Sequence, residues 1–283
     1  MDIVTNIYEG FCRADQAEQH RGYLGMSSIG KPCEREAWHS WRQTTGGIMP
    51  GSVLALLEQG KHVEQIICEG LRHAGYQLTH AWPDEQIGFS DMGGFFRGHP
   101  DGGILVPDRG WGVLETKGAC ATKMKKMVKN GIAATYPGYF GQVILYMGYW
   151  GMQFALIIVM SRSDGSMYQE YIDFDEAKFQ ALRARAARVL TAKASWMVEG
   201  PAEEEAKKTS ETCQMCRYRT QCYDGAEHIQ TIKTCRSCAW FQMSPAFEPS
   251  CSNPKHAFPL KALDKNCGDW EYVDQWNPEE VPF

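Results

Sequence analysis

Asp101, Glu115 and Lys117 are the residues of this chain whose types and spacing are best suited to chemistry. Glu115 and Lys117 lie two positions apart, so in a strand their side chains share one face, while Thr116 points away. The intervening Pro107-Asp108-Arg109-Gly110 has the composition of a tight turn, which predicts a hairpin that brings Asp101 to that same face. Two carboxylates beside an ammonium suit Mg²⁺ or Mn²⁺ with a metal-bound water that attacks a phosphodiester. By spacing alone, a solvated Glu/Lys pair on an exposed strand is the more common alternative.

The segments around this hairpin predict an α/β fold. Apolar residues at helical spacing predict a helix over residues 52–74, within which Gly60 would allow another backbone to approach closely. Further segments have helical or extended patterns: short strands near 76–80, 85–89 and 94–98, a helix over 137–150, a fully buried strand over 154–160, a strand over 168–174 and a long helix over 175–198. This order predicts a central mixed sheet flanked by helices.

Four lysines follow the hairpin, with no acidic residue before Asp164: Lys123, Lys125, Lys126 and Lys129. This stretch is interpreted as a DNA-binding segment that contacts phosphates, and a solvated helix face fits the same pattern equally well. Within the next predicted helix, Gln142 and Tyr146 lie four residues apart and therefore share a face. Alone, such a pair is an ordinary polar helix face.

Composition sets the class of protein. A chain of 283 residues can bury one sizeable core plus an appendage, and 43% hydrophobic with 22% charged residues is ordinary for a globular protein. No run of about 18 apolar residues indicates a membrane span, and the first residues lack the pattern of a secretory signal. We therefore expect a cytoplasmic protein. A net charge of -5 argues against a surface coated in nucleic acid, although a local basic groove remains compatible.

The eleven cysteines indicate metal ligation, because a chain without a leader peptide has little use for disulfides. Two partitions compete. The first is a zinc ribbon with the spacing C-x2-C-x18-C-x2-C, made of Cys213, Cys216, Cys235 and Cys238. The second divides the thiols into an iron–sulfur set of Cys33, Cys213, Cys216 and Cys222 and a zinc set of Cys235, Cys238, Cys251 and Cys267, in which His256 could replace one cysteine. Spacing slightly favours the ribbon, and thiolate chemistry does not decide.

Taken together, these motifs resemble the PD-(D/E)xK nuclease superfamily, in particular its RecB-like exonuclease branch with an iron–sulfur cluster. That branch includes CRISPR-associated RecB-like exonucleases and AddB-type helicase-nucleases, and phage recombination exonucleases share the core. The residues that carry the resemblance lie within 27–223: Pro100-Asp101 and Glu115-Thr116-Lys117 for the superfamily motif, His62 for the branch's helical histidine, Gln142 and Tyr146 for its Q-x3-Y motif, and Cys33 with Cys213, Cys216 and Cys222 for its cysteine pattern.

The resemblance implies a restriction-endonuclease-like core over residues 1–223, closed by a 4Fe–4S cluster on the second cysteine partition rather than by the ribbon. Residues 235–283 have no counterpart in the family, and residues 224–283 look like a small cysteine-rich zinc-binding tail. By the same resemblance, each active-site residue has a role: His62, Asp101, Glu115 and the Thr116 carbonyl hold Mg²⁺ or Mn²⁺, Lys117 orients the attacking water, and Gln142 and Tyr146 lie beside the DNA.

The function that this resemblance implies is metal-dependent exonucleolytic hydrolysis of DNA, with single strands or duplex ends as substrate. The setting would be phage or mobile-element recombination, repair or CRISPR-related processing, with a helicase, an annealing protein or an integration complex as partner, and no membrane. The alternatives are a metal-dependent endonuclease, a non-catalytic DNA-binding or assembly module on the same fold, and an iron–sulfur redox or metal-sensing protein.

Overall fold

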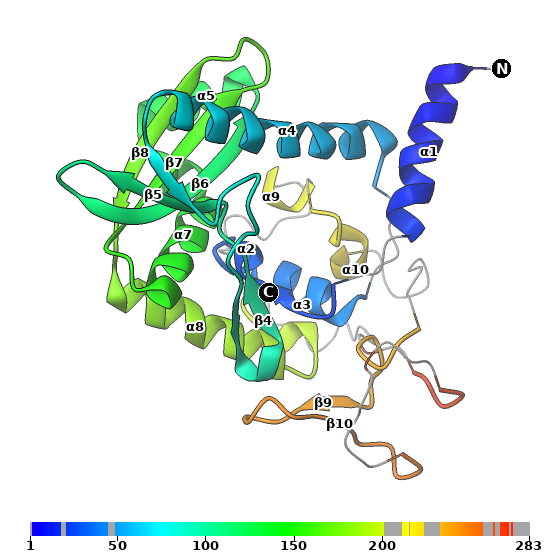
Figure 1. The fold of residues 1–283 in the computed structure, drawn as a ribbon. Coiled ribbons are helices and arrows are strands. Elements are labelled where there is room, and N and C mark those ends of the chain that lie inside the picture. The colour runs from blue at the N-terminus through cyan, green and yellow to red at the C-terminus, as the bar shows by residue number, and fades with distance from the viewer. Residues whose placement is uncertain are drawn as a thin grey trace. The chain divides into compact units, whose positions relative to one another are not determined.

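The computed structural model describes residues 2–17, 21–44, 49–200, 211–214, 216–223, 233–256, 263, 267–271 and 273. The chain, drawn as a ribbon in Figure 1, divides into two compact units. Unit 1 comprises residues 1–19, 48–89 and 98–182, and unit 2 comprises residues 20–47, 90–97 and 183–283. The predicted division at residues 223 and 224 stays a prediction.

Unit 1 is built on a five-stranded mixed sheet with the order β2-β5-β6-β7-β8. The strands are β2 (Gln77–Thr79), β5 (Gly102–Val106), β6 (Gly110–Ala119), β7 (Phe154–Ser161) and β8 (Met167–Asp173). β6 and β7 pair in parallel, and the other neighbours are antiparallel. The β5–β6 register, from Gly102 opposite Leu114 to Val106 opposite Gly110, confirms the predicted hairpin. The α/β class with a central mixed sheet is likewise confirmed.

Helices cover both faces of this sheet. Unit 1 contains α1 (Ile3–Ala17), α4 (Gly51–His73), α5 (Ala121–Asn130), α6 (Ile132–Thr135), α7 (Pro137–Trp150) and the first part of α8 (Glu176–Thr191). Val63 and Ile67 of α4 pack in one apolar cluster with Leu114 of β6. Glu115 points to the opposite face, since side chains alternate along a strand, and there it meets Gln142 of α7.

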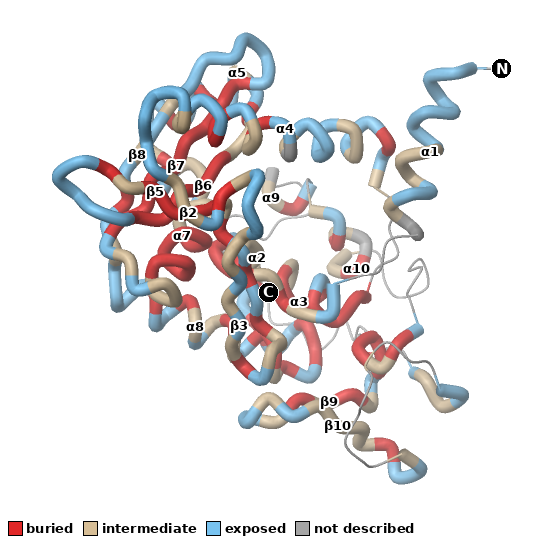
Figure 2. Tube along the Cα trace, viewed as in Figure 1, coloured by how far each residue is buried: buried red, intermediate tan, exposed pale blue. Residues whose placement is uncertain are grey.

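Burial follows the sequence pattern closely in the middle of unit 1. Every residue of β7 is buried, as its continuous apolar run predicts, and the centre of α7 is buried as well (Figure 2). The expectation for Gly60 is wrong, because a Cβ added there would meet nothing within 4 Å. No other backbone approaches this glycine among the described residues.

Unit 2 contains α2 (Met26–Ile29), α3 (Glu34–Arg42), α9 (Glu211–Gln214) and α10 (Arg219–Tyr223). Its strands are β1 (Leu24–Gly25), β3 (Phe89–Asp91), β4 (Phe96–Gly98), β9 (Phe241–Met243) and β10 (Pro249–Cys251), where β3 and β4 each carry one end residue of unit 1. Trp38 and Trp41 of α3 are buried in its core.

The predicted helix over 175–198 is too long, since α8 ends at Thr191 and a 3₁₀ turn follows at Ser195–Met197. The carbonyls beyond α8 accept from side chains: Trp38 Nε1 donates to Ala192 O at 2.9 Å and Arg42 to Lys193 O at 3.3 Å. These bonds replace the helical partners, so the helix stops. In the described part of the chain no helix has both the length and the apolar character needed to cross a membrane.

Candidate active site and thiol groups

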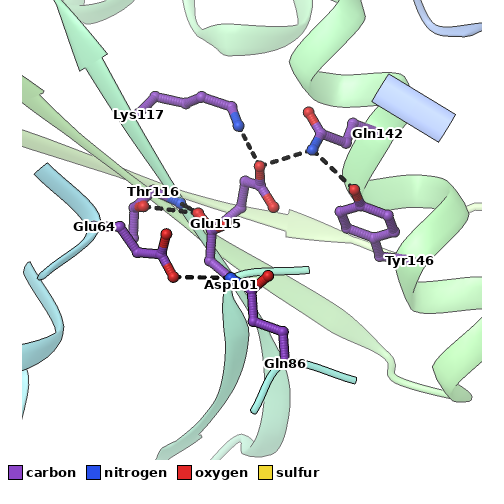
Figure 3. A network of polar contacts seen from close by, with 8 residues as sticks. All are labelled: Glu64, Gln86, Asp101, Glu115, Thr116, Lys117, Gln142 and Tyr146. Carbon is purple, nitrogen blue, oxygen red and sulfur yellow. Dashed lines mark hydrogen bonds and ion pairs between the residues drawn. The ribbon is translucent and has the colours of Figure 1, made fainter. Parts of the chain in front are cut away.

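The hairpin of unit 1 brings the predicted acidic residues together. Asp101 directly precedes β5, and Glu115 and Lys117 lie in β6. The N–H and the hydroxyl of Thr116 both donate to Oδ2 of Asp101, at 2.7 Å each (Figure 3). We expected Asp101 to share the face of Glu115 and Lys117. Its carboxylate instead accepts hydrogen bonds from Thr116, the residue between them, because Asp101 lies at the strand end rather than within the strand.

Glu115 is the centre of the site. Its side chain is 1% exposed, it forms an ion pair with Lys117, and Gln142 Nε2 donates to its Oε1 at 2.8 Å. Among the described residues, no donor reaches its buried Oε2. Burial, reinforced by the Asp101 charge, raises the pKa of Glu115 to about 8. A desolvated carboxylate with one oxygen left without a donor fits a divalent-cation ligand, because a bound cation would satisfy that oxygen.

Lys117 provides a fixed positive charge. Burial alone would lower the pKa of Lys117, but the Glu115 and Asp101 carboxylates outweigh burial, so the pKa lies above its ordinary value. The ammonium also lies over the ring of Tyr139, at 5.2 Å from its centre. Lys117 is therefore a cation at neutral pH, which suits an electrostatic contribution rather than that of a base.

Gln142 and Tyr146 of α7 form a buried network with Glu115. Gln142 Nε2 donates both to Glu115 and, at 3.0 Å, to the Tyr146 hydroxyl oxygen. Burial raises the pKa of Tyr146, so its phenol is neutral. The two residues that share a helix face in the sequence thus point into the site together (Figure 3).

Glu64 of α4 is a third carboxylate at this site, and the sequence reasoning missed it. Gln86 Nε2 donates to its Oε1 at 2.8 Å, and burial together with the Asp101 charge raises the pKa of Glu64. His62, the predicted helical ligand, is exposed. The signal in the sequence was helical spacing, since Glu64 lies four residues before Cys68, which is buried. We call Glu64, Asp101 and Glu115 the acidic cluster.

The acidic cluster matches the donor chemistry of a hard divalent cation, although its side chains do not surround one point. Within the described ranges, no three His, Cys, Asp or Glu side chains are arranged to hold a metal ion. The predicted Thr116 carbonyl and His62 ligands stay predictions.

The four lysines predicted to bind DNA lie on α5 and are all exposed: Lys123, Lys125, Lys126 and Lys129. Met124 and Met127 form the buried side of the same helix. The helix is therefore amphipathic, which both interpretations of the lysines require.

In unit 2, two thiols assigned to the iron–sulfur set, Cys33 and Cys213, affect the pKa of a third, Cys216. Burial raises the pKa of Cys216 to about 11, and the charges of Cys33 and Cys213 contribute in the same direction. Cys33 is the N-cap of α3, and Cys222 Sγ lies 3.9 Å from Nε2 of the buried His39. No disulfide bond joins any of the described cysteines.

The four thiols assigned to zinc line a single cavity of about 20 Å³ in unit 2: Cys235, Cys238, Cys251 and Cys267. His256 and Asp269 line it too, and His256 Nε2 lies 2.7 Å from Asp269 Oδ2. This cavity joins Cys235 and Cys238 with Cys251 and Cys267, the grouping of the second cysteine partition.

No protein-family model and no curated protein matches the chain. Among solved structures, an alkaline exonuclease from Laribacter hongkongensis is 17% identical, with a TM-score of 0.44 over 64% of this chain and 90% of that one. A structure of SSO0001 is 11% identical, with a TM-score of 0.45 over 77% of this chain and 95% of that one. A phage-related exonuclease from Haemophilus somnus 129PT is 16% identical, with a TM-score of 0.31 over 46% and 64%. At this distance the similarity says nothing of function, which rests on the residues of the site.

Proposed function

We propose that this protein is a metal-dependent nuclease that hydrolyses DNA phosphodiester bonds and acts from strand ends. The observation that carries the proposal is Glu115: a buried carboxylate, one of whose oxygens has no donor among the described residues, beside Asp101 and ion-paired with Lys117. This set of side chains belongs to the pattern that resembles the PD-(D/E)xK nucleases. Burying such a group is costly unless a cation joins it.

In the proposed mechanism, Asp101, Glu115 and Glu64 would hold Mg²⁺ or Mn²⁺. When bound, the cation supplies a water ligand of lowered pKa and neutralises phosphate charge. Lys117, held as a cation by Glu115, orients the attacking water and offsets the charge that develops on the phosphate oxygens. Thr116 donates two hydrogen bonds to Oδ2 of Asp101 and so fixes the orientation of this carboxylate, including that of its other oxygen, Oδ1. Gln142 and Tyr146 orient Glu115 and lie beside the strand.

Sequence specificity would be weak, because no motif in the chain is typical of groove reading. The proposed substrate is therefore DNA with free ends, single-stranded or duplex. The proposed setting is phage or mobile-element recombination, repair or CRISPR-related processing, with a helicase, an annealing protein or an integration complex as partner. The proposed location is the cytoplasm of a bacterial or phage-infected cell.

The test is cleavage of end-labelled linear DNA beside closed circular DNA, with anaerobically purified protein in Mg²⁺ or Mn²⁺. Lys117→Ala is expected to abolish cleavage, because it removes the only ammonium that contacts Glu115 among the described residues. Lys178→Ala is the matched control, since Lys178 is an exposed lysine on α8.

The outcomes separate the alternatives. Loss of linear DNA that depends on Lys117 supports the exonuclease, and cutting of circles turns the proposal to an endonuclease. A protein that binds DNA but shows no Lys117-dependent cleavage of either substrate would be a DNA-binding module, and the catalytic proposal would be wrong.

We further propose that Cys33, Cys213, Cys216 and Cys222 hold a 4Fe–4S cluster in unit 2. The electrostatic effect of Cys33 and Cys213 on the buried thiol of Cys216 supports the proposal, as does the thiolate chemistry that such clusters require. Visible absorption and electron paramagnetic resonance of anaerobic protein test it, with Cys213→Ser expected to lose the signal. A redox couple in a protein without nuclease activity would instead favour the redox-sensor alternative.

For the C-terminal segment we propose a structural zinc ion on Cys235, Cys238, Cys251 and Cys267. Their common cavity supports this assignment, and four thiolates are a usual donor set for structural zinc. Metal analysis is expected to give one zinc per chain, lost in Cys251→Ser. His256→Asn tests the alternative ligand set, in which His256 takes the place of one cysteine. Loss of zinc from this variant would show that the histidine is a ligand.

A further inference from the structure

Two tyrosines at the start of α7 have no assigned role in binding the DNA strand. Tyr136 is the N-cap of α7, and Tyr139 lies in its first turn. Their rings stack with centres 5.2 Å apart and planes 24° from parallel. Both side chains are half-buried, so the pair reaches the surface.

The pair continues the active-site face of α7 outward. Tyr139, Gln142 and Tyr146 are spaced by three and four residues, which places them on one side of the helix. Their exposure rises along this row, from 2% at Tyr146 and 7% at Gln142 to the half-buried Tyr139. The row therefore begins at Glu115, which Gln142 contacts, and ends at the stacked rings.

A lysine lies over each ring of the pair. Lys117 Nζ is 5.2 Å from the centre of the Tyr139 ring, and Lys123 Nζ is 5.5 Å from that of Tyr136. Cations alternating with aromatic faces are the arrangement by which proteins bind single-stranded nucleic acid, with rings for bases and cations for phosphates. Lys123 is exposed on α5, so its ammonium can leave the ring for a phosphate.

We propose that Tyr136 is a stacking site for an unpaired nucleobase of the DNA strand next to the scissile phosphate. The base takes the place of the Lys123 ammonium on the Tyr136 ring, and Lys123 turns to a neighbouring phosphate. Tyr139 supports Tyr136 from behind and holds Lys117. This proposal rests on the proposed nuclease function, because it assumes that a DNA strand occupies the site. It narrows the substrate to ends with at least one unpaired nucleotide, read without regard to sequence.

The experiment measures binding without cleavage. Wild-type protein in EDTA is titrated with a short single-stranded oligonucleotide that carries 2-aminopurine near one end, and its fluorescence reports stacking. Tyr136→Ala is expected to raise Kd by about 5- to 150-fold, the range for losing one base–aromatic stack. Tyr136→Phe keeps the ring and is expected to bind like the wild type. The same oligonucleotide with abasic sites in place of its bases is the ligand control, and on it Tyr136→Ala and wild type should have equal Kd values.

Tyr171→Ala is the protein control, since Tyr171 is another tyrosine of unit 1 with a cation, Arg109, over its ring. Equal Kd for wild type and Tyr136→Ala on the base-containing strand would overturn the proposal. So would an equal loss on the abasic strand, which indicates a structural defect. The nuclease proposal can fail separately. It would be wrong if wild-type protein and Lys117→Ala did not differ in cleavage with metal, while the stacking signal persisted.

Discussion

Glu64 and His62 lie two residues apart on α4, and only one of them reaches the acidic cluster. Glu64→Gln is expected to raise the Mg²⁺ concentration needed for half-maximal cleavage by about 10- to 100-fold, because it removes a charge that would face the cation. His62→Gln is expected to stay within about twofold, since the imidazole is exposed. Mg²⁺ titrations of cleavage rate with both variants decide between them. A large effect of His62→Gln with none of Glu64→Gln would restore the helical histidine that the family resemblance implies.

The same two residues show which parts of a site can be predicted from sequence. Glu115 and Lys117 are local, because strand alternation alone sets them on one face. Glu64 is not local, since its closeness to Asp101 depends on how α4 packs against β6. The resemblance pointed to His62, and no expectation from the sequence pointed to Glu64; only the structure shows that Cys68, four residues after Glu64, is buried. That Oε2 of Glu115 has no donor among the described residues could not be predicted either, because it depends on the position of every neighbouring side chain.

Two helical glycines of unit 1 differ in what surrounds them. Nothing lies within 4 Å of a Cβ added at Gly60 of α4, whereas one added at Gly148 of α7 would overlap the ring of Phe179. Gly60→Ala is therefore expected to increase the free energy of unfolding by about 0.5–1 kcal/mol. Gly148→Ala is expected to decrease it by about 1–3 kcal/mol, because Phe179 is buried and must shift. Urea denaturation measures both, and a destabilised Gly60→Ala protein would mean that α4 needs its glycine after all.

Arg42 joins three segments of unit 2 through its buried guanidinium. It donates to carbonyls of Lys193, Arg236 and Cys238, and it lies over the rings of Trp38 and Phe241. Arg42→Met keeps the apolar stem but removes the side-chain donor to these carbonyls, at roughly 1–3 kcal/mol for each carbonyl left without a donor, whereas Cys238 O still accepts from Phe241 N. We expect unit 2 to unfold at markedly lower urea, whereas Arg13→Met, at an exposed arginine, changes stability by less than about 0.5 kcal/mol. If Arg42→Met and Arg13→Met changed stability to urea by similar amounts, Arg42 would not hold the three segments together.

Elements of unit 1 were easier to predict than those of unit 2. β7 and α7 have periodic or continuous apolar patterns, and α7 begins and ends at the predicted residues. The end of α8 could not be predicted in this way. Trp38 and Arg42, more than a hundred positions earlier in the chain, donate to the carbonyls of Ala192 and Lys193, which lie just beyond the helix. The cavity that Cys235 and Cys267 both line likewise depends on long-range packing, so residue spacing, which slightly favours the ribbon, could not predict it.

At the scale of the whole molecule, a net charge of -5 opposes binding to a polyanion, so any DNA affinity needs a local concentration of cations. The segment from 118 to 163 is the natural place, because it contains lysines and no acidic residue. Met124 and Met127 anchor α5, which leaves its four exposed lysines on the solvent side. If these lysines meet phosphates, their contribution must depend on salt, since each neutralised phosphate releases a counterion.

Replacing Lys123, Lys125, Lys126 and Lys129 together by Gln is therefore expected to weaken single-strand binding and to flatten its salt dependence. The slope of log K against log salt concentration should fall in magnitude by about 0.7 for each phosphate that the variant no longer neutralises. Kd measured in EDTA between about 50 and 200 mM salt gives this slope. Lys125→Gln alone should show a quarter of the effect if all four lysines contribute, and Lys178→Gln, with the same charge change on α8, should show none. An unchanged slope in the fourfold variant would mean that these lysines are a solvated helix face, and that the strand approaches the acidic cluster over Tyr136 and Lys117 alone.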